Sequence, residues 1–246
     1  MGQVFICRKI KARFRSVTSE SIVRRIPLAV FLTFAITSPA WSQAAQKTAP
    51  TPHKHLTVEQ LWTLDATYTD PKHGVTFRYP SVWAAGTGFA YHQPLLTTSR
   101  DADIIATYGY DARNPPPDGP SSPYVGSDLE GFGFTYATAA GANQAQCETM
   151  AEPVADSKTH TSVLIGMRRF SSYEVGEGGM SQSTGGDLYV TFAESTCYFF
   201  ETDSGWIARG VFEDVKSLSN RDSALIFAHL WEIMNTVRIS PSGRGQ

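Results

Sequence analysis

The apolar and polar positions that open the patterned part of the chain predict a short helix over residues 58–65. Thr57 and Gln60 are spaced as a capping box, in which each residue satisfies a free backbone N–H at the helix start. Leu56 and Leu61 are spaced as the hydrophobic staple that often accompanies such a box. A helix this short is stable only when it packs against other elements.

Several later segments alternate apolar with polar residues, and this period of two is typical of strands with one buried face. Short turns separate neighbouring segments, so we expect an antiparallel sheet. Ser204-Gly205 is predicted as a hairpin turn between the last two strands. The predicted strands are residues 75–79, 102–110, 131–138, 161–170, 187–193, 196–202 and 206–212.

Two segments without such a period are predicted as long loops. Residues 111–128 contain five prolines, and residues 171–186 are rich in glycine and serine. Long loops inside a compact domain are often functional, although they also serve as simple connections. A further helix is expected over residues 139–151.

The clearest helix signal starts at Ser219, a capping residue followed three positions later by Asp222. The helix carries a wide apolar stripe that must be buried, and residues 236–240 are expected to return as a final strand. The predicted fold class is therefore α+β, with a central antiparallel β-sheet flanked by helices and the C-terminal amphipathic helix packed across the sheet. The stripe consists of Leu225, Ile226, Ala228, Leu230, Trp231, Ile233 and Met234.

The N-terminal segment has the pattern of a secretory signal. Seven basic residues and one acid precede an apolar run of 11 residues at positions 26–36, and small residues allow cleavage after Ala40 or Ala44. The run is shorter than the roughly 20 apolar residues that span a bilayer. We therefore expect a signal peptide over residues 1–44 rather than an uncleaved anchor, and no stable membrane insertion after cleavage. The mature protein is expected to be periplasmic or secreted.

The remaining chain is expected to form a disordered linker over residues 45–56, a single domain over residues 57–240 and a disordered tail over residues 241–246. Seven of the 21 basic residues and one of the 23 acidic residues precede residue 45, which leaves 14 and 22 and a formal net charge of −8. Binding to phosphates requires clustered lysine and arginine, so this charge argues against a nucleic-acid partner.

Cysteine usage points to one disulfide. Cys7 lies within the predicted signal peptide, which leaves Cys147 and Cys197 as a pair in an oxidising compartment. A bond between them closes a loop of 51 residues and contributes about 4 kcal/mol in the chain-entropy model. The alternative is two separate buried thiols.

No motif in the chain indicates catalysis. The serine-hydrolase elbow, the phosphate-binding loop, the dinucleotide glycine pattern and Cys-x-x-Cys are all missing. We predict no catalytic residue and no cofactor, which favours a non-catalytic role without deciding whether the protein is an enzyme. His53 and His55 are the one close histidine pair, and a solvated linker explains them better than a metal site does.

Two stretches resemble PsbP-like domains. Residues 74–83, GVTFRYPSVW, are similar to the opening hairpin of that superfamily, and residues 228–239, AHLWEIMNTVRI, are similar to its closing helix and strand. The resemblance spans roughly residues 66–240 but is specific only at these two ends. It implies an antiparallel sheet with helices on its faces, and interaction or assembly modules rather than enzymes. Tyr79, Trp83 and Trp231 are expected to be core residues.

These expectations favour an exported, non-catalytic interaction or assembly module of the cell envelope, which binds an unidentified envelope or secreted protein. The alternative is a small-ligand carrier or a hydrolytic enzyme, with a pocket between the sheet and the helices that one of the two long loops covers. Ordered loops around a cavity favour the alternative, whereas an exposed apolar patch favours a protein partner.

Overall fold

The structure is a computed structural model that describes residues 55–86, 102–113, 121–153, 155–156, 159–179, 181–207 and 214–240. The predicted signal peptide, most of the predicted linker and the predicted tail lie outside these residues. At the start of the described chain, His55 forms a bridge with Ser121, and the backbone N–H of Leu56 donates to the Ser121 carbonyl at 3.0 Å. Leu56 is already part of the core.

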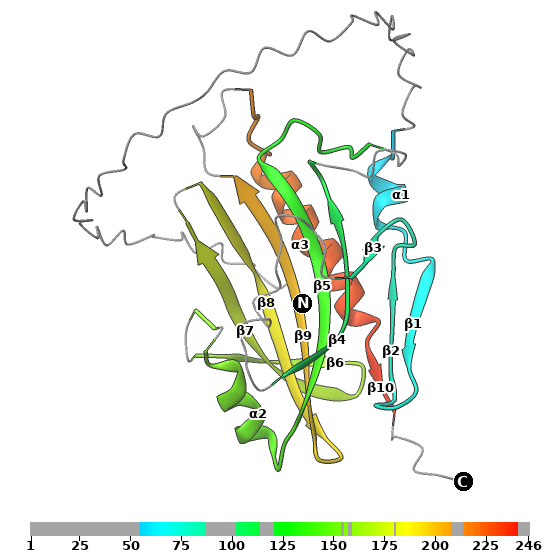
Figure 1. Ribbon diagram of the computed structural model, residues 1–246, viewed down its shortest axis with the longest axis vertical. Coiled ribbons are helices and arrows are strands. Elements are labelled where there is room, and N and C mark those ends of the chain that lie inside the picture. Colours follow the sequence, from blue (N-terminus) through cyan, green and yellow to red (C-terminus); the bar gives the residue numbers. More distant parts are fainter. Residues whose placement is uncertain are drawn as a thin grey trace, which may run out of the picture. The chain divides into compact units, whose positions relative to one another are not determined.

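Most of the described chain forms two antiparallel sheets, so the predicted antiparallel pairing is confirmed (Figure 1). The structure differs from the prediction in having two sheets and few helices. The larger sheet has seven strands in the order β3-β4-β5-β9-β8-β7-β6, and the smaller has the order β1-β2-β10. The strands are β1 Ala66–Asp70, β2 Val75–Tyr79, β3 Ala84–Ala85, β4 Asp103–Asp111, β5 Leu129–Ala140, β6 Thr161–Ile165, β7 Arg168–Gly178, β8 Gln182–Ala193, β9 Thr196–Ile207 and β10 Arg238–Ile239.

The first helix, α1 (Val58–Trp62), begins as the capping pattern predicts. The Thr57 hydroxyl accepts from the Gln60 N–H and the Gln60 side chain accepts from the Thr57 N–H, both at 3.1 Å. The helix ends earlier than predicted and buries Leu61 and Trp62. The indole N–H of Trp83 donates to the Leu61 carbonyl at 3.1 Å, which ties the chain after β2 to α1.

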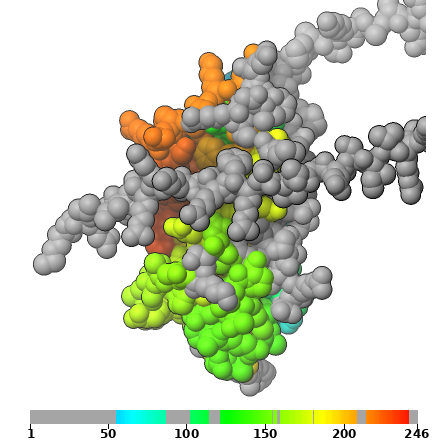
Figure 2. Space-filling view, turned by 90° about the vertical axis from the view of Figure 1, so that its left-hand side faces the viewer, coloured from blue at the N-terminus to red at the C-terminus, as the bar shows by residue number. Residues whose placement is uncertain are grey.

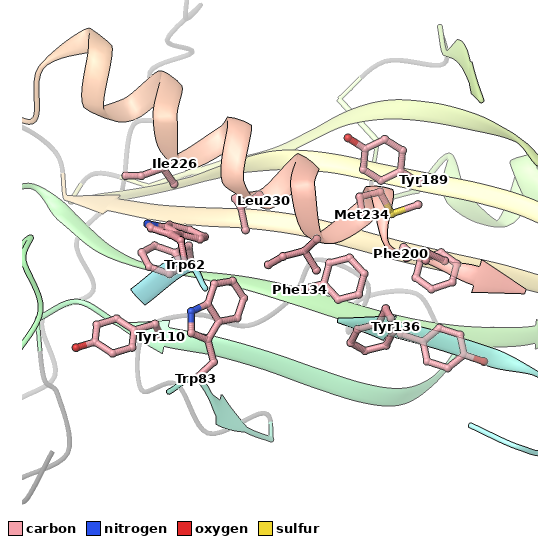
Figure 3. Packing of buried hydrophobic residues seen from close by; sticks show 14 of the residues in the cluster. Trp62, Trp83, Tyr110, Phe134, Tyr136, Tyr189, Phe200, Ile226, Leu230 and Met234 are labelled. Carbon is pink, nitrogen blue, oxygen red and sulfur yellow. The ribbon is translucent and has the colours of Figure 1, made fainter. Parts of the chain in front are cut away.

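The last helix, α3 (Asn220–Asn235), is capped by Ser219, and it buries four apolar side chains of the predicted stripe. Figure 3 shows Ile226, Leu230 and Met234 of α3 above aromatic side chains of the sheet. These residues form one core with α1, the smaller sheet and strands β4, β5 and β9. Since this core joins residues from Leu56 to Val237, the described residues between them depend on one another for stability.

Three sequence predictions about turns and loops are wrong. Residues 171–186 are not a loop, because they form most of β7 and the start of β8. Residues 161–170 are not one strand but β6 and the start of β7, separated by a tight turn at Gly166. Ser204-Gly205 is not a turn, since β9 continues through it with β5 and β8 paired on its two sides. Backbone pairing with two neighbouring strands here outweighs the local preference of Ser204-Gly205 for a turn.

The helix α2 (Gln144–Ala151) is shorter than predicted, because residues 139–140 still belong to β5. The side chain of Asn143 caps it by accepting from the Gln146 N–H. A second core lies under α2 and includes both cysteines. The final strand β10 lies within the predicted segment and pairs with β2.

Candidate functional site

The β6–β7 hairpin ends the seven-stranded sheet and exposes apolar side chains. Gly166 is the first of its two turn residues and has a φ of 61°, which suits a tight turn with glycine at that position. Leu164 is 65% exposed and Met167 is 102% exposed, whereas Ile165 between them is buried. Figure 2 shows the lime-coloured atoms of this region at the surface, beside the green atoms of α2.

Within the described ranges, this edge has none of the features that usually prevent a sheet edge from pairing with other chains. Natural edge strands are protected by lysine, proline, bulges or a covering segment. β6 has the sequence Thr-Ser-Val-Leu-Ile, with no charge and no proline, and its pairing with β7 has no bulge. Among the described residues, β6 pairs with β7 alone. As far as the structure describes the chain, the edge is therefore open to another strand.

Arginine side chains surround the hairpin. Arg169 lies opposite Leu164, and its Nη1 donates to the Ser162 hydroxyl at 3.1 Å, which places the guanidinium over β6. Arg238 of β10 lies close to the turn, within 4 Å of the position that a Cβ on Gly166 would take. No carboxylate among the described residues forms an ion pair with either arginine. The hairpin is thus locally positive on an acidic protein.

On the other side of the sheet from α3, a disulfide fixes α2. The Sγ atoms of Cys147 on α2 and Cys197 on β9 lie 2.01 Å apart. Gly141 lies against them, and a Cβ at that position would be 2.3 Å from the Cys197 Sγ. Only glycine therefore leaves room for the bond.

A polar cluster next to this disulfide comes nearest to a catalytic arrangement. Glu148 accepts a hydrogen bond from the Ser171 hydroxyl at 2.5 Å and one from the Gln144 side-chain amide at 3.0 Å. The Nε2 atom of His160 lies 3.9 Å from the same carboxylate. Burial raises the pKa of Glu148, but these hydrogen bonds and His160 outweigh it and leave the pKa below its usual value. A carboxylate with a lowered pKa is a weak base, and here the carboxylate, not the histidine, holds the serine. The cluster attaches α2 to β7.

Three carboxylates gather on the α3 side of β7 and β8. Asp187 lies opposite Glu174 across the two strands, and Asp156 lies over Gly176 on the same face. Burial and the charge of Glu174 raise the pKa of both Asp187 and Asp156. Across the described chain, no group of three or more histidine, cysteine, aspartate or glutamate side chains is arranged to hold a metal ion.

Two further carboxylates are buried on the opposite face of β9. Glu201 and Asp203 are each 1% exposed, and glycines of β5 and β8 lie on both sides of Asp203. Both residues interact with other groups of the protein. Both carboxylates therefore lie in the interior of the protein, on the sheet.

The described histidines have structural roles. His73 Nδ1 lies 2.6 Å from Asp70, which also accepts from the Tyr136 hydroxyl at 3.2 Å, so this group ties the β1–β2 turn to β5. His229 stacks on Trp62, with ring centroids 4.9 Å apart. His55 contacts the Ser121 hydroxyl, and His53, the other residue of the close pair, lies outside the described residues.

The sequence signals identified some of these residues and missed others. The cysteine pair was found by its even number, and Trp83 is buried as expected at 4% exposure, while Tyr79 and Trp231 are partly buried against the core. The β6 edge was missed, because residues 161–170 were predicted as one continuous strand and not as two strands joined by a turn. Gly166 inside an apparent strand was the one local signal of that hairpin.

None of the helices in the described ranges is long and apolar enough to cross a membrane.

Comparison with known proteins gives little similarity. No family model matches the chain, and no curated protein matches its sequence. A solved structure from Bacteroides thetaiotaomicron aligns with a TM-score of 0.39 and 11% identity, covering 75% of this chain and 52% of its own. LpqN of Mycobacterium tuberculosis, described as involved in cell envelope biogenesis, aligns with a TM-score of 0.30 and 8% identity, covering 58% and 80%. This chain thus spans about half the length of the first structure, and both TM-scores are too low to assign a shared fold.

Proposed function

We propose that this chain is an exported, non-catalytic module that binds a protein partner in the cell envelope or outside the cell. The observation that carries the proposal is the β6 edge, where Leu164 on an uncharged strand and Met167 in the adjoining turn are exposed, and where β6 pairs with β7 alone in the described part of the chain. An unprotected edge with apolar side chains promotes aggregation unless a partner covers it, so its presence in an exported protein favours binding.

Export is supported by the signal pattern of residues 1–44 and by the disulfide between Cys147 and Cys197, a bond that persists in oxidising compartments. In this proposal the mature protein begins with a linker at residue 45, continues as one domain to residue 240, in which Leu56 is already part of the core, and ends with a tail over residues 241–246. The resemblance of residues 74–83 and 228–239 to PsbP-like domains agrees with an interaction module. A non-catalytic role is supported by Glu148, because it is the group that holds Ser171 and its pKa is lowered.

Site-specific photo-crosslinking in the source organism tests the proposal. A photoreactive amino acid at Met167 is expected to give an adduct with one defined protein. The same substitution at Val125, which is 57% exposed on a different part of the chain, is the matched control and is expected to give none. The absence of an adduct from Met167, or turnover of a substrate by the purified protein, would overturn the proposal.

A further inference from the structure

We propose that β6 accepts an extended strand of a partner protein, and that this strand carries carboxylate side chains which pair with Arg169. The partner thereby adds a strand to the open edge of the seven-stranded sheet. This inference rests on the proposed function, and it names the binding mode and the chemistry of the partner.

The backbone of β6 offers the hydrogen bonds that such a strand needs. In the tight turn that closes the hairpin, Ile165 and Arg168 are the paired residues on either side, so they hydrogen-bond to each other. Alternate residues of an antiparallel strand point their N–H and C=O groups in opposite directions. Ser162 and Leu164 therefore point theirs away from β7, and among the described residues no backbone group outside β7 bonds to either.

The exposed side chains beside these groups specify what the added strand carries. Leu164 and Met167 offer apolar contact area at the edge itself. The guanidinium of Arg169 reaches across β6 to the Ser162 hydroxyl, so its charge lies over the strand next to the open edge. Arginine binds carboxylates through paired, charge-assisted hydrogen bonds. A strand that alternates apolar and acidic residues satisfies both features.

A second copy of this chain fits the edge less well. Antiparallel pairing of two β6 strands brings two copies of Arg169 to the same joint, and β6 itself contributes no carboxylate to pair with them. The two domains also repel each other, because residues 45–246 carry a formal net charge of −8. Charge complementarity thus favours a different protein with an acidic strand.

Selection of peptides on the purified, disulfide-bonded chain tests this inference. The probe is a phage-displayed library of random dodecapeptides. Bound peptides are expected to be enriched in aspartate and glutamate alternating with apolar residues, and depleted in proline. The strongest peptide, made synthetically, is expected to slow hydrogen exchange at the amides of Ser162 and Leu164 while leaving the inward-facing Val163 amide unchanged.

Variants assign the effect to the edge and to the charge. Arg169→Gln is expected to weaken the acidic peptide about tenfold, whereas Arg221→Gln, at an exposed arginine of α3, leaves binding unchanged. Leu164→Pro removes one outward N–H and is expected to abolish binding. Leu164→Lys keeps this N–H but places a lysine on the edge strand, and it is expected to weaken binding. It is the second variant to use if the proline variant fails to fold. Leu225→Lys, at an exposed leucine of α3, is the matched control for the latter.

Three outcomes overturn the inference. They are selected peptides without acidic enrichment, protection of amides other than those of Ser162 and Leu164, and a concentration-dependent dimer that itself protects these two amides. If Met167 forms the crosslink described above while any of these is observed, the partner-binding function stands and strand addition by an acidic segment falls. If no crosslink forms and no peptide is selected, both fall.

Discussion

Asp187 and Glu174 lie directly opposite each other on β8 and β7, and no lysine, arginine or histidine in the described ranges forms an ion pair with either. Like charges at directly opposite positions of an antiparallel pair destabilise it. Burial raises the pKa of Asp187, and Glu174 raises it further, although the hydrogen bond from the Tyr189 hydroxyl at 3.3 Å acts in the other direction. The sheet holds together despite this pair.

Asp187→Asn is therefore expected to stabilise the protein at neutral pH, by about 0.5 kcal/mol. A raised pKa means that the folded state holds this proton more tightly than the unfolded state does. The parent protein thus loses stability as the pH rises from the unfolded value of 3.8 to the pKa of the folded protein, and the variant does not show this part of the loss. Urea unfolding at a series of pH values measures the difference. Glu177→Gln is the control, because Glu177 lies opposite Thr184 and not opposite an acid.

Two adjacent glycines of β8 are expected to respond differently to the same substitution. A Cβ on Gly186 would lie 1.8 Å from the Thr202 carbonyl oxygen, whereas a Cβ on Gly185 meets nothing within 4 Å. Gly186→Ala must push β8 away from β9, and we expect it to cost about 3 kcal/mol or more. Gly185→Ala is expected to remain within about 1 kcal/mol of the parent protein. Urea unfolding of the two variants gives the comparison, and equal losses would contradict it.

The turn between β8 and β9 shows why local signals predicted the hairpins unevenly. The residues that turn are Glu194 and Ser195, which have φ values of 49° and 63° although neither is glycine. Ser204-Gly205 has the composition of a turn and lies inside a strand. The long-range pairing of β9 with β5 and β8 determines that the chain turns at Glu194 and Ser195 and stays extended at Ser204-Gly205. Alternation predicted strands such as β2, β4 and β5, whereas most of β7 was predicted as a loop and the ends of the strands were not predicted.

Replacing the strained turn is expected to stabilise the protein. Both central residues of a two-residue turn with positive φ favour Asn-Gly, because asparagine and glycine adopt that backbone conformation at low cost. The double change Glu194→Asn and Ser195→Gly is expected to raise the free energy of unfolding by about 1 kcal/mol. The reverse change at the other tight turn, Gly166→Ala with φ 61°, is expected to lower it. Thermal unfolding of both variants checks the two signs.

The disulfide is expected to supply a large part of the stability of this domain. Cys147 and Cys197 are 50 residues apart in sequence, and a loop of that length gives about 4 kcal/mol in the chain-entropy model. Cys147→Ser with Cys197→Ser is expected to lower the free energy of unfolding by that order. The parent protein in reductant is the control and should match the double variant. No change on reduction would show that the bond does not stabilise the fold.

The candidate site was harder to predict than the core. Trp83 and the stripe of α3 were found because burial leaves a periodic apolar pattern. The β6 edge depends on which strand is last in the sheet, and strand order is set by pairings between segments distant in sequence. Arg169 is one arginine among many in the sequence. Its position over Ser162 follows only from the register of β6 with β7.

Acid is expected to weaken the attachment between the two sheets through Asp70. Burial raises the pKa of this carboxyl, but hydrogen bonds from the side chain and backbone of His73 and from the backbone of Lys72 outweigh it, so the pKa lies below 3.8. A lowered pKa contributes stability that is present above the unfolded value and is lost as the pH falls through the value of the folded protein.

Asp70→Asn is accordingly expected to cost about 2 kcal/mol at neutral pH, since the Tyr136 hydroxyl and His73 lose a charged acceptor. The gap between parent and variant should close at low pH, where the parent carboxyl is protonated as well. Urea unfolding from neutral to acidic pH measures it, with Asp103→Asn, at an exposed position of β4, as the control. A gap that is independent of pH would assign the loss to packing instead of charge, because packing does not respond to protonation of this group.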